Sequence, residues 1–339
     1  MEDTLKYLMG SPGPSGFGSG STAEQVTETT TSSSSHLSSL TAIITGATSG
    51  IGAETARVLA KRGVRLILPA RTLKAAEETK ARILSESPNS HIIVMPLDLS
   101  SLSSVRSFVF HFHSHHLPLH LLINNAGKFA HHHAISEDGF EMSFATNYLG
   151  HFLLTDLLLK TMVETAEKSG IQGRIVNVSS NVHGWFSGDI IRYLALITRH
   201  NSHYDPTRAY ALSKLANILH TKHLALKLQE MGANVTANCV HPGIVRTRLT
   251  REREGLLTDI GFLLTSKFLK TIPQAAATTC YVATHPRLLN VSGKYFADCN
   301  EASTSKLASN SSEAARLWTA SECMISDGPK SLVDLLHNQ

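Results

Sequence analysis

The sequence predicts an α/β protein in which one doubly wound parallel sheet forms a single large domain. Short runs that are apolar along their whole length recur from residue 41 onward, as in TAIITG, VRLILPAR and GRIVNVSS. Such strands are typical of a parallel sheet that is covered on both faces. Between them lie segments with apolar residues at helical spacing, such as AETARVLAKRG. Alternation of strands with helices indicates helices packed on both sides of the sheet.

Each element can be placed in order along the chain. Strands are expected at 41–46, 64–71, 91–99, 119–127, 173–180 and 234–243, with a last short strand at 293–299. Helices are expected at 53–63, 72–87, 104–116, 140–170 and 209–232, and a long loop at 181–208. Residues 41–320 then form one domain of Rossmann type. The Gly-, Pro- and Ser-rich residues 1–40 are expected to be a flexible arm with one short helix, capped by Ser21 or Thr22, and residues 321–339 a tail.

Composition excludes several classes of protein. The chain has 339 residues, 42% of them hydrophobic, and a net charge of +4 without a long basic run, so nucleic acid is not an expected partner. The four cysteines are widely spaced and form neither a C-x-x-C pair nor a zinc pattern, so no metal is expected and the thiols are read as reduced. The sequence contains no apolar run of about 18 residues, and the first residues do not resemble a secretory signal.

A glycine-rich turn follows the first strand directly. TGATSGIG places Gly46, Gly50 and Gly52 between a strand and a helix. Glycine lets the backbone turn sharply and approach a ligand, and the amides at the start of the helix favour a pyrophosphate. Ala70 and Arg71 end the second strand, where a carboxylate would select NAD. A guanidinium there suits a 2′-phosphate, so we expect NADP(H); the alternative is that Arg71 only points into solvent.

These motifs resemble, in their order, those of the short-chain dehydrogenase/reductases. The chain carries TGATSGIG, LDL, NNAG, NYLGHF, VNVSS, YALSK and HPGIVRT over about 200 residues. NYLGHFLL and SKLANILH resemble the retinol-dehydrogenase-like branch. The arm GPSGFGSGSTAEQV and the segment VSGKYFADCN resemble plant members of the family associated with the translocon of the chloroplast inner envelope.

The resemblance implies a role for each matching residue. It assigns Asn147, Ser180, Tyr210 and Lys214 to a catalytic tetrad, with Ser180 preferred to Ser179. It assigns cofactor contacts to the glycine turn, to the ends of three strands, to the segment after the sixth strand and to two of the tetrad: Gly46, Ser49, Gly50, Ile51, Gly52, Arg71, Asp98, Leu99, Asn125, Ala126, Gly127, Tyr210, Lys214, Pro242, Gly243, Val245 and Thr247. It also implies a substrate lid at about 249–272.

The spacing of Tyr210 and Lys214 has a chemical reason. Residues four apart lie on one face of a helix, so the ammonium would lie close to the phenol. A neighbouring cation favours tyrosinate and is expected to lower the phenol pKa toward neutrality. Ser180 would donate a hydrogen bond to the substrate oxygen. Asn147 would hold a water that links Lys214 to solvent.

Two further features have competing interpretations. The histidine clusters at 111–116 and 131–133 are read as solvated side chains rather than metal ligands, because no H-E-x-x-H pattern or cysteine accompanies them. The apolar residues of 249–272 would cover a lipophilic substrate or lie on a membrane surface: Leu256, Leu257, Ile260, Leu263, Leu264 and Phe268.

Two hypotheses for function remain at this point. The first is an NADP(H)-dependent carbonyl reductase or alcohol dehydrogenase that acts on a lipophilic small molecule. The second is an NADP(H)-binding redox sensor or regulatory subunit of a chloroplast envelope import complex. The intact tetrad favours the enzyme. The family resemblance implies a chloroplast envelope location, contact with a membrane or envelope complex, and a homo-oligomer; a cytoplasmic location is the alternative.

Overall fold

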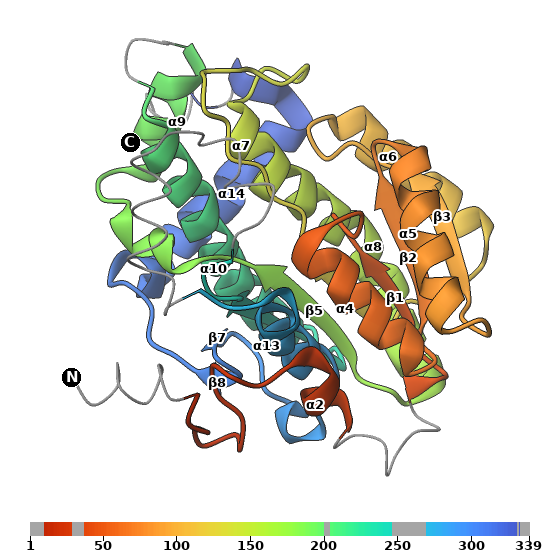
Figure 1. Cartoon of the computed structure of the whole chain (residues 1–339). Coiled ribbons are helices and arrows are strands. Elements are labelled where there is room, and N and C mark those ends of the chain that lie inside the picture. Colours follow the sequence, from red (N-terminus) through yellow and green to blue (C-terminus); the bar gives the residue numbers. More distant parts are fainter. Residues whose placement is uncertain (1–9, 29–36, 200–203, 246–268, 331, 333–339) are drawn as a thin grey trace, which may run out of the picture.

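A computed structural model of the chain describes residues 10–28, 37–199, 204–245, 269–330 and 332. Its centre is a sheet in the order β3-β2-β1-β4-β5-β6-β7-β8, in which every pairing is parallel except that of β7 with β8 (Figure 1). The strands are β1 (Thr41–Ile44), β2 (Arg65–Ala70), β3 (Ile92–Pro96), β4 (Leu121–Asn124), β5 (Gly173–Val178), β6 (Val235–His241), β7 (Tyr295–Ala297) and β8 (Asn300–Glu301). The predicted doubly wound α/β fold is confirmed.

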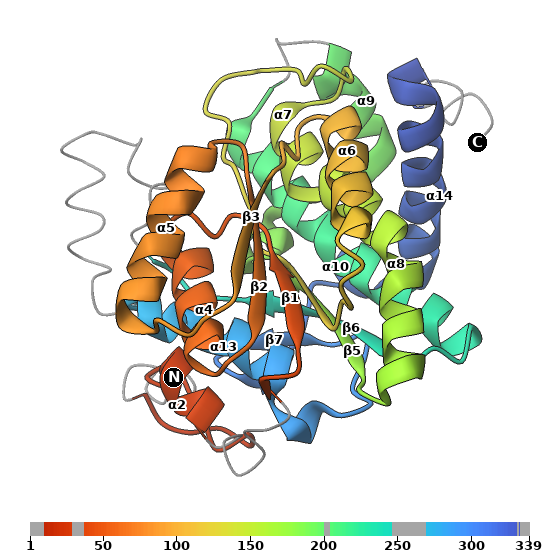
Figure 2. The ribbon, with the colours of Figure 1, turned by 90° about the vertical axis from the view of Figure 1, so that its right-hand side faces the viewer.

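Helices cover both faces of this sheet (Figure 2). One face carries α4 (Gly50–Lys61), α5 (Leu73–Glu86) and α13 (Ile272–Thr284). The other carries α6 (Leu102–Ser114), α7 (Met142–Phe144), α8 (Gly150–Ser169) and α10 (Pro206–Glu230), with α14 (Ser311–Asp327) packed on α10. Short turns of helix complete the chain: the π-turn η2 (Ala145–Leu149) and the 3₁₀ turns η3 (Asn181–Trp185), η6 (Pro286–Leu288), η7 (Leu307–Ser309) and η8 (Gly328–Lys330).

Adjacent residues of each central strand contribute to different cores. Ile43 of β1 belongs to the core under α8 and α10, whereas Ala42 and Ile44 belong to the core under α4 and α13. In the same way, Ile67 of β2 and Leu122 of β4 belong to the first core, whereas the residues on either side of them belong to the second. The side chains of a strand alternate between faces, so a sheet buried on both sides needs apolar residues at every position. This requirement explains the unbroken apolar runs of the sequence.

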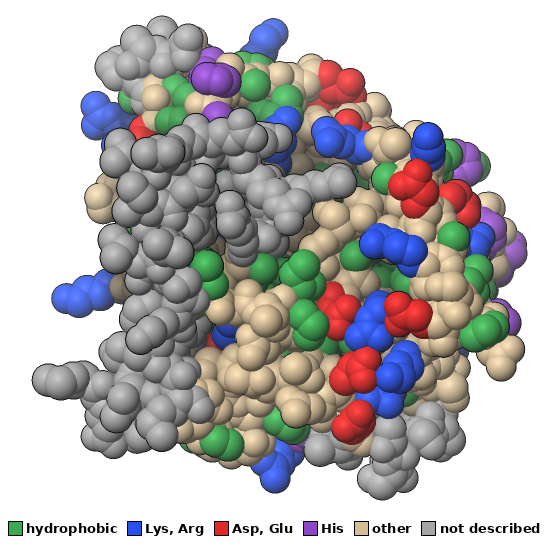
Figure 3. All heavy atoms as spheres, viewed as in Figure 1, with side chains coloured by type: hydrophobic (Ala, Val, Ile, Leu, Met, Phe, Trp, Pro, Cys, Tyr) green, Lys and Arg blue, Asp and Glu red, His purple; other side chains and the backbone are tan. Residues whose placement is uncertain are grey.

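Residues 10–28 differ from the flexible arm expected from their composition. The helix α2 (Ala23–Glu28) buries Ala23 and Val26 against α4 and α13, and Thr22 and Gln25 form the predicted cap at its start. Glu24 pairs with Arg57 at 2.7 Å and with Lys61 at 3.0 Å. Acidic and basic side chains alternate on the surface over α2 and α4 (Figure 3).

The segment before α2 is also fastened to the domain. Asn300 accepts a hydrogen bond from the Ser15 amide at 2.9 Å and donates one to the Phe17 carbonyl at 2.9 Å. The Phe17 ring contacts the rings of Tyr281 and His285 edge-on, at 5.7 and 5.8 Å. Partners this remote in the sequence leave no local pattern, so composition alone gave the wrong expectation for 10–28.

Two segments that were expected to be irregular are helical. The interval after Ser180 contains α9 (Ile190–Arg199), whose buried face includes Ile190, Ile191 and Leu194. The expected C-terminal tail begins inside α14, which continues to Asp327, and Leu332 is buried beyond it. Among the residues described, no helix has the length and apolar character needed to cross a membrane.

Candidate active site

The residues expected to bind the dinucleotide gather where β1 and β4 end side by side. The chain leaves β1 toward β2 on one side, and β4 lies on the other, so the strand order reverses at this point. Ligands of open α/β sheets bind in the crevice outside such a reversal. The turn after β1 and the segment after β4 meet here through the Thr45 hydroxyl, which accepts hydrogen bonds from the amides of Asn125 and Ala126 at 2.9 and 3.0 Å.

Two glycines of the turn have no room for a side chain. Gly46 has a φ of +66°, and a Cβ there would lie 2.7 Å from the Ala126 Cα. A Cβ on Gly52 would overlap the Gly46 carbonyl and the side-chain amide of Asn125. That amide donates to the Thr45 carbonyl at 2.9 Å, which fixes the turn against β4. The glycines therefore let α4 begin directly beneath the end of β1.

The start of α4 presents its amides to the turn. Ser49 is the N-cap, but its side chain makes no capping hydrogen bond. Because the first amides of a helix lack partners within the helix, they are available to an anion such as a pyrophosphate. Ser49, Gly50 and Ile51 are half-buried, which keeps these groups accessible.

Asn147 lies on the π-turn η2, where the long helix of residues 142–169 is locally widened. Its side-chain amide donates to the Lys128 carbonyl at 2.8 Å and to the Ser213 hydroxyl at 3.0 Å, and its side-chain carbonyl accepts from the Lys128 amide at 2.6 Å. These bonds tie η2 to the segment after β4 and to α10. π-turns often mark functional sites because they release one backbone group from regular pairing.

The backbone of Asn147 is linked to the glycine turn through His151. The Nδ1 of His151 donates to the Asn147 carbonyl at 3.0 Å, and its Nε2 accepts from the Thr45 hydroxyl at 2.8 Å. Burial lowers the pKa of His151 to about 4, so the ring is neutral near pH 7. The sequence indicated neither Thr45 nor His151 as a site residue, although Thr45 begins the motif TGATSGIG and His151 lies within NYLGHF.

Lys214 and Tyr210 lie on one face of α10, as predicted. The Lys214 ammonium is buried and donates to the Val178 carbonyl at 3.0 Å. It lies 5.5 Å from the centre of the Tyr210 ring, and a Cβ on Gly127 would be 3.4 Å from it. The end of β5, the segment after β4 and α10 thus converge on one ammonium group.

The pKa values of this pair are set mainly by burial. Burial lowers the pKa of the Lys214 ammonium from 10.5 to about 8. It raises the pKa of the Tyr210 phenol above its ordinary value of 10. The chain by itself therefore does not lower the phenol pKa as the sequence led us to expect, because burial of the hydroxyl disfavours tyrosinate.

The two serines after β5 have different environments. Ser179 is buried, and its hydroxyl donates to the Lys214 carbonyl at 2.7 Å. Ser180 is half-buried, and its hydroxyl makes only long bonds, to the Asn181 side chain at 3.3 Å and from the Val182 amide at 3.4 Å. Ser179 therefore holds α10 against the sheet, whereas Ser180 retains a hydroxyl that a ligand can reach.

The adenosine side of the crevice holds three of the expected residues. Arg71 follows β2 and is exposed. Asp98 follows β3, and its carboxylate accepts from the Ser100 amide at 2.9 Å. Leu99 is buried. These positions surround the end of β2, where an adenosine ribose would lie.

The segment after β6 carries Pro242, Gly243 and Val245, while Thr247 lies outside the described residues. Gly243 has a φ of +97°, and a Cβ there would be 2.6 Å from the side chain of Lys270. Lys270 is itself buried, and its ammonium is 2.5 Å from the carboxylate of Asp298. The expected lid lies almost wholly outside the described residues, with its apolar positions Leu256, Leu257, Ile260, Leu263, Leu264 and Phe268.

The histidines at 131–133 lie beside the site. His131 contacts Phe129, whose ring lies 5.3 Å from that of Tyr210. His133 bonds the Ile197 carbonyl of α9 at 2.6 Å. Among the described residues no group of acidic, histidine and cysteine side chains has the arrangement of a metal site.

Comparison with known proteins identifies the family. Residues 40–195 match the family model for short chain dehydrogenases. The chain is 48% identical over 324 residues to the chloroplastic short-chain dehydrogenase TIC 32 A of Brassica napus, covering 95% of this chain and 98% of that protein. The chain belongs to the short-chain dehydrogenase family. Human retinol dehydrogenase 12 is 40% identical over 283 residues, covering 82% of this chain and 84% of that one.

Solved structures of other proteins show the same fold. An uncharacterised protein from Mycobacterium paratuberculosis is 32% identical, with a TM-score of 0.66 over 84% of this chain and 93% of that one. An actinorhodin polyketide ketoreductase with NADPH is 25% identical, with a TM-score of 0.58 over 76% of this chain and 95% of that one. As a short-chain dehydrogenase, this chain is an oxidoreductase that uses a nicotinamide cofactor.

The residues of this short-chain dehydrogenase fit such a cofactor. The glycine turn keeps side chains away from the amides of α4, and the buried Lys214 supplies a cation at the other end of the crevice. Sequence reasoning missed the groups that support these residues, namely Thr45, Lys128, His151 and Ser213. Their roles depend on contacts between residues that are distant in the sequence. The only sequence signal for them is that they lie within or beside the family motifs.

Proposed function

We propose that the chain is an NADP(H)-dependent oxidoreductase that interconverts a carbonyl and an alcohol on a lipophilic small molecule. The observation that carries the proposal is the buried Lys214 ammonium one helical turn from Tyr210, with the accessible hydroxyl of Ser180 at the end of β5. Burying an ammonium group is costly, so a lysine without a functional role would be expected to keep its ammonium in solvent.

Each group of the tetrad has a distinct task. Bound NADPH would supply the hydride. The Tyr210 hydroxyl would give its proton to the carbonyl oxygen during reduction, and the Lys214 cation would stabilise the tyrosinate that remains. Ser180 would donate a hydrogen bond to the same oxygen. Asn147 would hold η2 in place through Lys128 and Ser213, and would hold the water that links Lys214 to solvent.

The preference for NADP(H) rests on Arg71. A guanidinium follows β2 where a carboxylate would otherwise bind the ribose hydroxyls, and it is exposed and free to pair with a 2′-phosphate. The other cofactor contacts that we propose lie on the two sides of the crevice: Gly46, Ser49, Gly50, Ile51, Gly52, Asp98, Leu99, Asn125, Ala126, Gly127, Pro242, Gly243, Val245 and Thr247.

A lipophilic substrate suits the apolar side chains near the tetrad. Trp185 and Ile244 follow Ser180 and Gly243 closely in the chain and are 67% and 45% exposed. Phe129 lies against Tyr210. Relatives of about 40% identity are retinol dehydrogenases, which supports a long apolar substrate.

We also propose that the protein acts in the chloroplast, at the envelope. Support comes from the two Brassica napus relatives, which are chloroplastic and 48% identical. A fluorescent fusion of the whole chain tests this. We expect signal at the chloroplast rim for the whole chain, and a diffuse cytoplasmic signal for the whole chain would contradict it.

A turnover assay tests the enzymatic proposal. Purified protein is incubated with NADPH and with retinal-like, steroid-like and aryl aldehydes, and NADPH consumption and alcohol formation are followed. We expect turnover of at least one apolar aldehyde. Tight NADPH binding without turnover of any of them would contradict the enzymatic role and favour a redox sensor.

A further inference from the structure

His183 connects the backbone of Ser180 to a segment more than a hundred residues further along the chain. The Nδ1 of His183 bonds the Ser180 carbonyl at 2.8 Å, and its Nε2 bonds the Ser305 amide at 3.1 Å. We propose that His183 is a positioning residue that fixes the orientation of Ser180 for catalysis. The inference rests on the proposed function, in which Ser180 bonds the substrate oxygen.

The two partners of His183 fix its tautomer. The Ser305 amide can only donate, so Nε2 must accept and carry no proton. Nδ1 must then carry the proton and donate to the Ser180 carbonyl. The ring is 5% exposed, which disfavours its charged form, and Lys222 lies near enough to disfavour that form further. His183 is thus a neutral imidazole with both nitrogens engaged.

These bonds restrict the rotation of the Ser180 peptide group. The Ser180 carbonyl accepts from the His183 ring at 2.8 Å and from the His183 amide at 3.2 Å. Ser180 is held in an extended conformation, with φ −158° and ψ 157°. Rotating the peptide would break both bonds. The amide of the same peptide group donates to the His241 ring at 3.3 Å, so His183 and His241 together restrict the backbone that places the weakly bonded Ser180 side chain. Within the described part of the chain, no other side chain bonds this carbonyl.

The far side of His183 is held by two rigid elements. Its ring lies edge-on to Tyr295 of β7, with 5.3 Å between ring centres. Thr304, next to Ser305, accepts a hydrogen bond from Lys222 of α10 at 3.3 Å. The imidazole therefore cannot swing toward the sheet or toward α10 without losing a contact.

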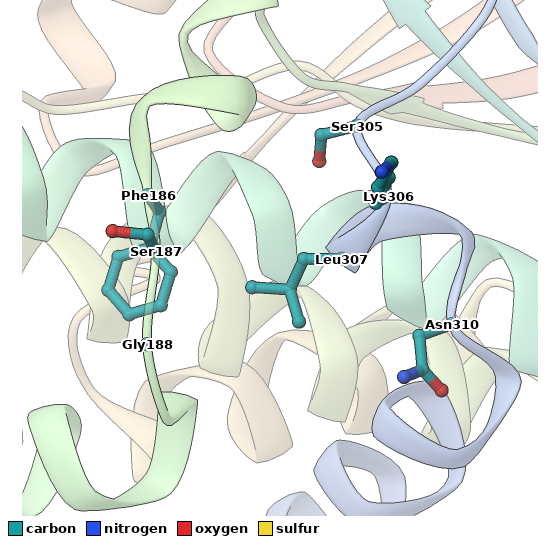
Figure 4. Close-up of a pocket in the computed structure, with 7 residues that line it drawn as sticks. All are labelled: Phe186, Ser187, Gly188, Ser305, Lys306, Leu307 and Asn310. Carbon is teal, nitrogen blue, oxygen red and sulfur yellow. The ribbon is translucent and has the colours of Figure 1, made fainter.

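A surface pocket lies directly beside this connection (Figure 4). It has a volume of about 470 Å³ and is lined by Phe186, Ser187 and Gly188 from the loop after η3 and by Ser305, Lys306, Leu307 and Asn310 from the C-terminal segment. The Phe186 ring faces Leu307 across the pocket. The Ser305 bond of His183 therefore joins the η3 turn, which precedes one wall of the pocket, to a residue of the other wall.

Two substitutions separate the contacts of His183. In His183→Asn the amide nitrogen takes the place of Nδ1, so the donor to Ser180 is kept and the Ser305 acceptor is lost. In His183→Gln the amide oxygen takes the place of Nε2, so the Ser305 acceptor is kept and the donor to Ser180 is lost. We expect kcat to fall about tenfold in the Gln variant and less than about threefold in the Asn variant. The KM for NADPH should stay unchanged in both.

Hydrogen exchange at the Ser305 amide provides a readout that does not depend on turnover. We expect lost protection in the Asn variant and kept protection in the Gln variant. Two outcomes would overturn the positioning role and leave the proposed function intact. One is a kcat for the Gln variant equal to that of wild type. The other is an equal loss of kcat in both variants together with equal shifts in melting temperature. No turnover by wild type would overturn the proposed function. Exchange at Ser305 that is identical in all three proteins would then overturn the His183 contacts themselves.

Discussion

The Lys214 ammonium lies 5.5 Å from the centre of the Tyr210 ring and donates to the Val178 carbonyl at 3.0 Å. The lysine thus faces the phenol without bonding its hydroxyl. Desolvation is the main influence on the pKa of both side chains. It lowers the pKa of Lys214 to about 8 and raises that of Tyr210. The lysine is therefore poised to change charge in the pH range in which the enzyme would work.

The first prediction concerns the pH dependence of carbonyl reduction. Lys214 is charged below its pKa of about 8 and loses its proton as the pH rises through that value. Only the charged form stabilises tyrosinate, so kcat/KM for the aldehyde at saturating NADPH should be constant at lower pH and fall above about pH 8. Steady-state rates from pH 6 to pH 10 measure this directly.

Lys214→Arg serves as the control for this assignment. Arginine keeps its charge throughout the range, so the decline above about pH 8 should disappear whatever the absolute rate of the variant. A decline with the same midpoint in the arginine variant would show that another group titrates.

The second prediction concerns cofactor choice. Arg71→Ala should raise the KM for NADPH about tenfold to a hundredfold and leave the KM for NADH nearly unchanged, because only NADPH carries the 2′-phosphate. Arg65→Ala, at the opposite end of β2, is the matched control and should change neither value. Equal effects of Arg71→Ala on both cofactors would remove the basis for the NADP(H) preference.

The third prediction concerns the buried ion pair beside Gly243. Asp298→Asn removes the charge that faces the buried Lys270 ammonium while keeping a residue that tolerates the φ of +51° at this position. We expect about 3 kcal/mol lower stability, measured from urea unfolding, since an unpaired charge would remain buried. Adding Lys270→Met should recover part of the loss.

The exposed pair of Lys294 and Glu301 gives the contrast for this measurement. Both side chains are about half exposed, so Glu301→Gln should cost under about 1 kcal/mol. Similar losses for Asp298→Asn and Glu301→Gln would mean that burial of Lys270 does not make its partner essential.

The fourth prediction concerns the N-terminal segment. Phe17→Ala removes the ring that contacts Tyr281 and His285, so it should lower stability by about 1–2 kcal/mol and speed proteolysis within residues 10–28. Phe110→Ala is the control, because that ring is 73% exposed and should cost no more than about 0.5 kcal/mol. Equal melting temperatures for wild type and Phe17→Ala would indicate that the segment does not contribute to the fold in solution.

Sequence patterns predicted the parts of this protein that depend on local rules. The strands of the sheet follow unbroken apolar runs, and the glycine turn follows β1 because only glycine fits at Gly46 and Gly52. Helical spacing correctly predicted that Tyr210 and Lys214 share one face of α10, whereas the tetrad as a whole was implied by the family resemblance. Features that depend on remote partners were missed: the π-turn at Asn147 has no local signal, and the docking of Ser15 on Asn300 joins residues 285 positions apart.

Three helices were missed although their signals are local, and one of them is α14, which follows the N-cap Asn310. The α13 helix begins with a capping box of Thr271 and Gln274, and α9 places Ile190, Leu194 and Ile197 on one buried face. The α9 helix lies within residues 181–208, which were expected to be a loop, and α13 begins at the end of the expected lid. The low phenol pKa was expected wrongly because sequence spacing gives proximity but not desolvation.

The most direct test of the proposed chemistry is turnover by Tyr210→Phe, compared with wild type at equal NADPH saturation. The variant keeps the ring that contacts Phe129 and loses only the hydroxyl. We expect NADPH affinity to be unchanged, as measured by fluorescence titration, and kcat to fall by about 10² to 10⁴. A variant that binds NADPH normally and still reduces the aldehyde at the wild-type rate would show that Tyr210 does not supply the proton.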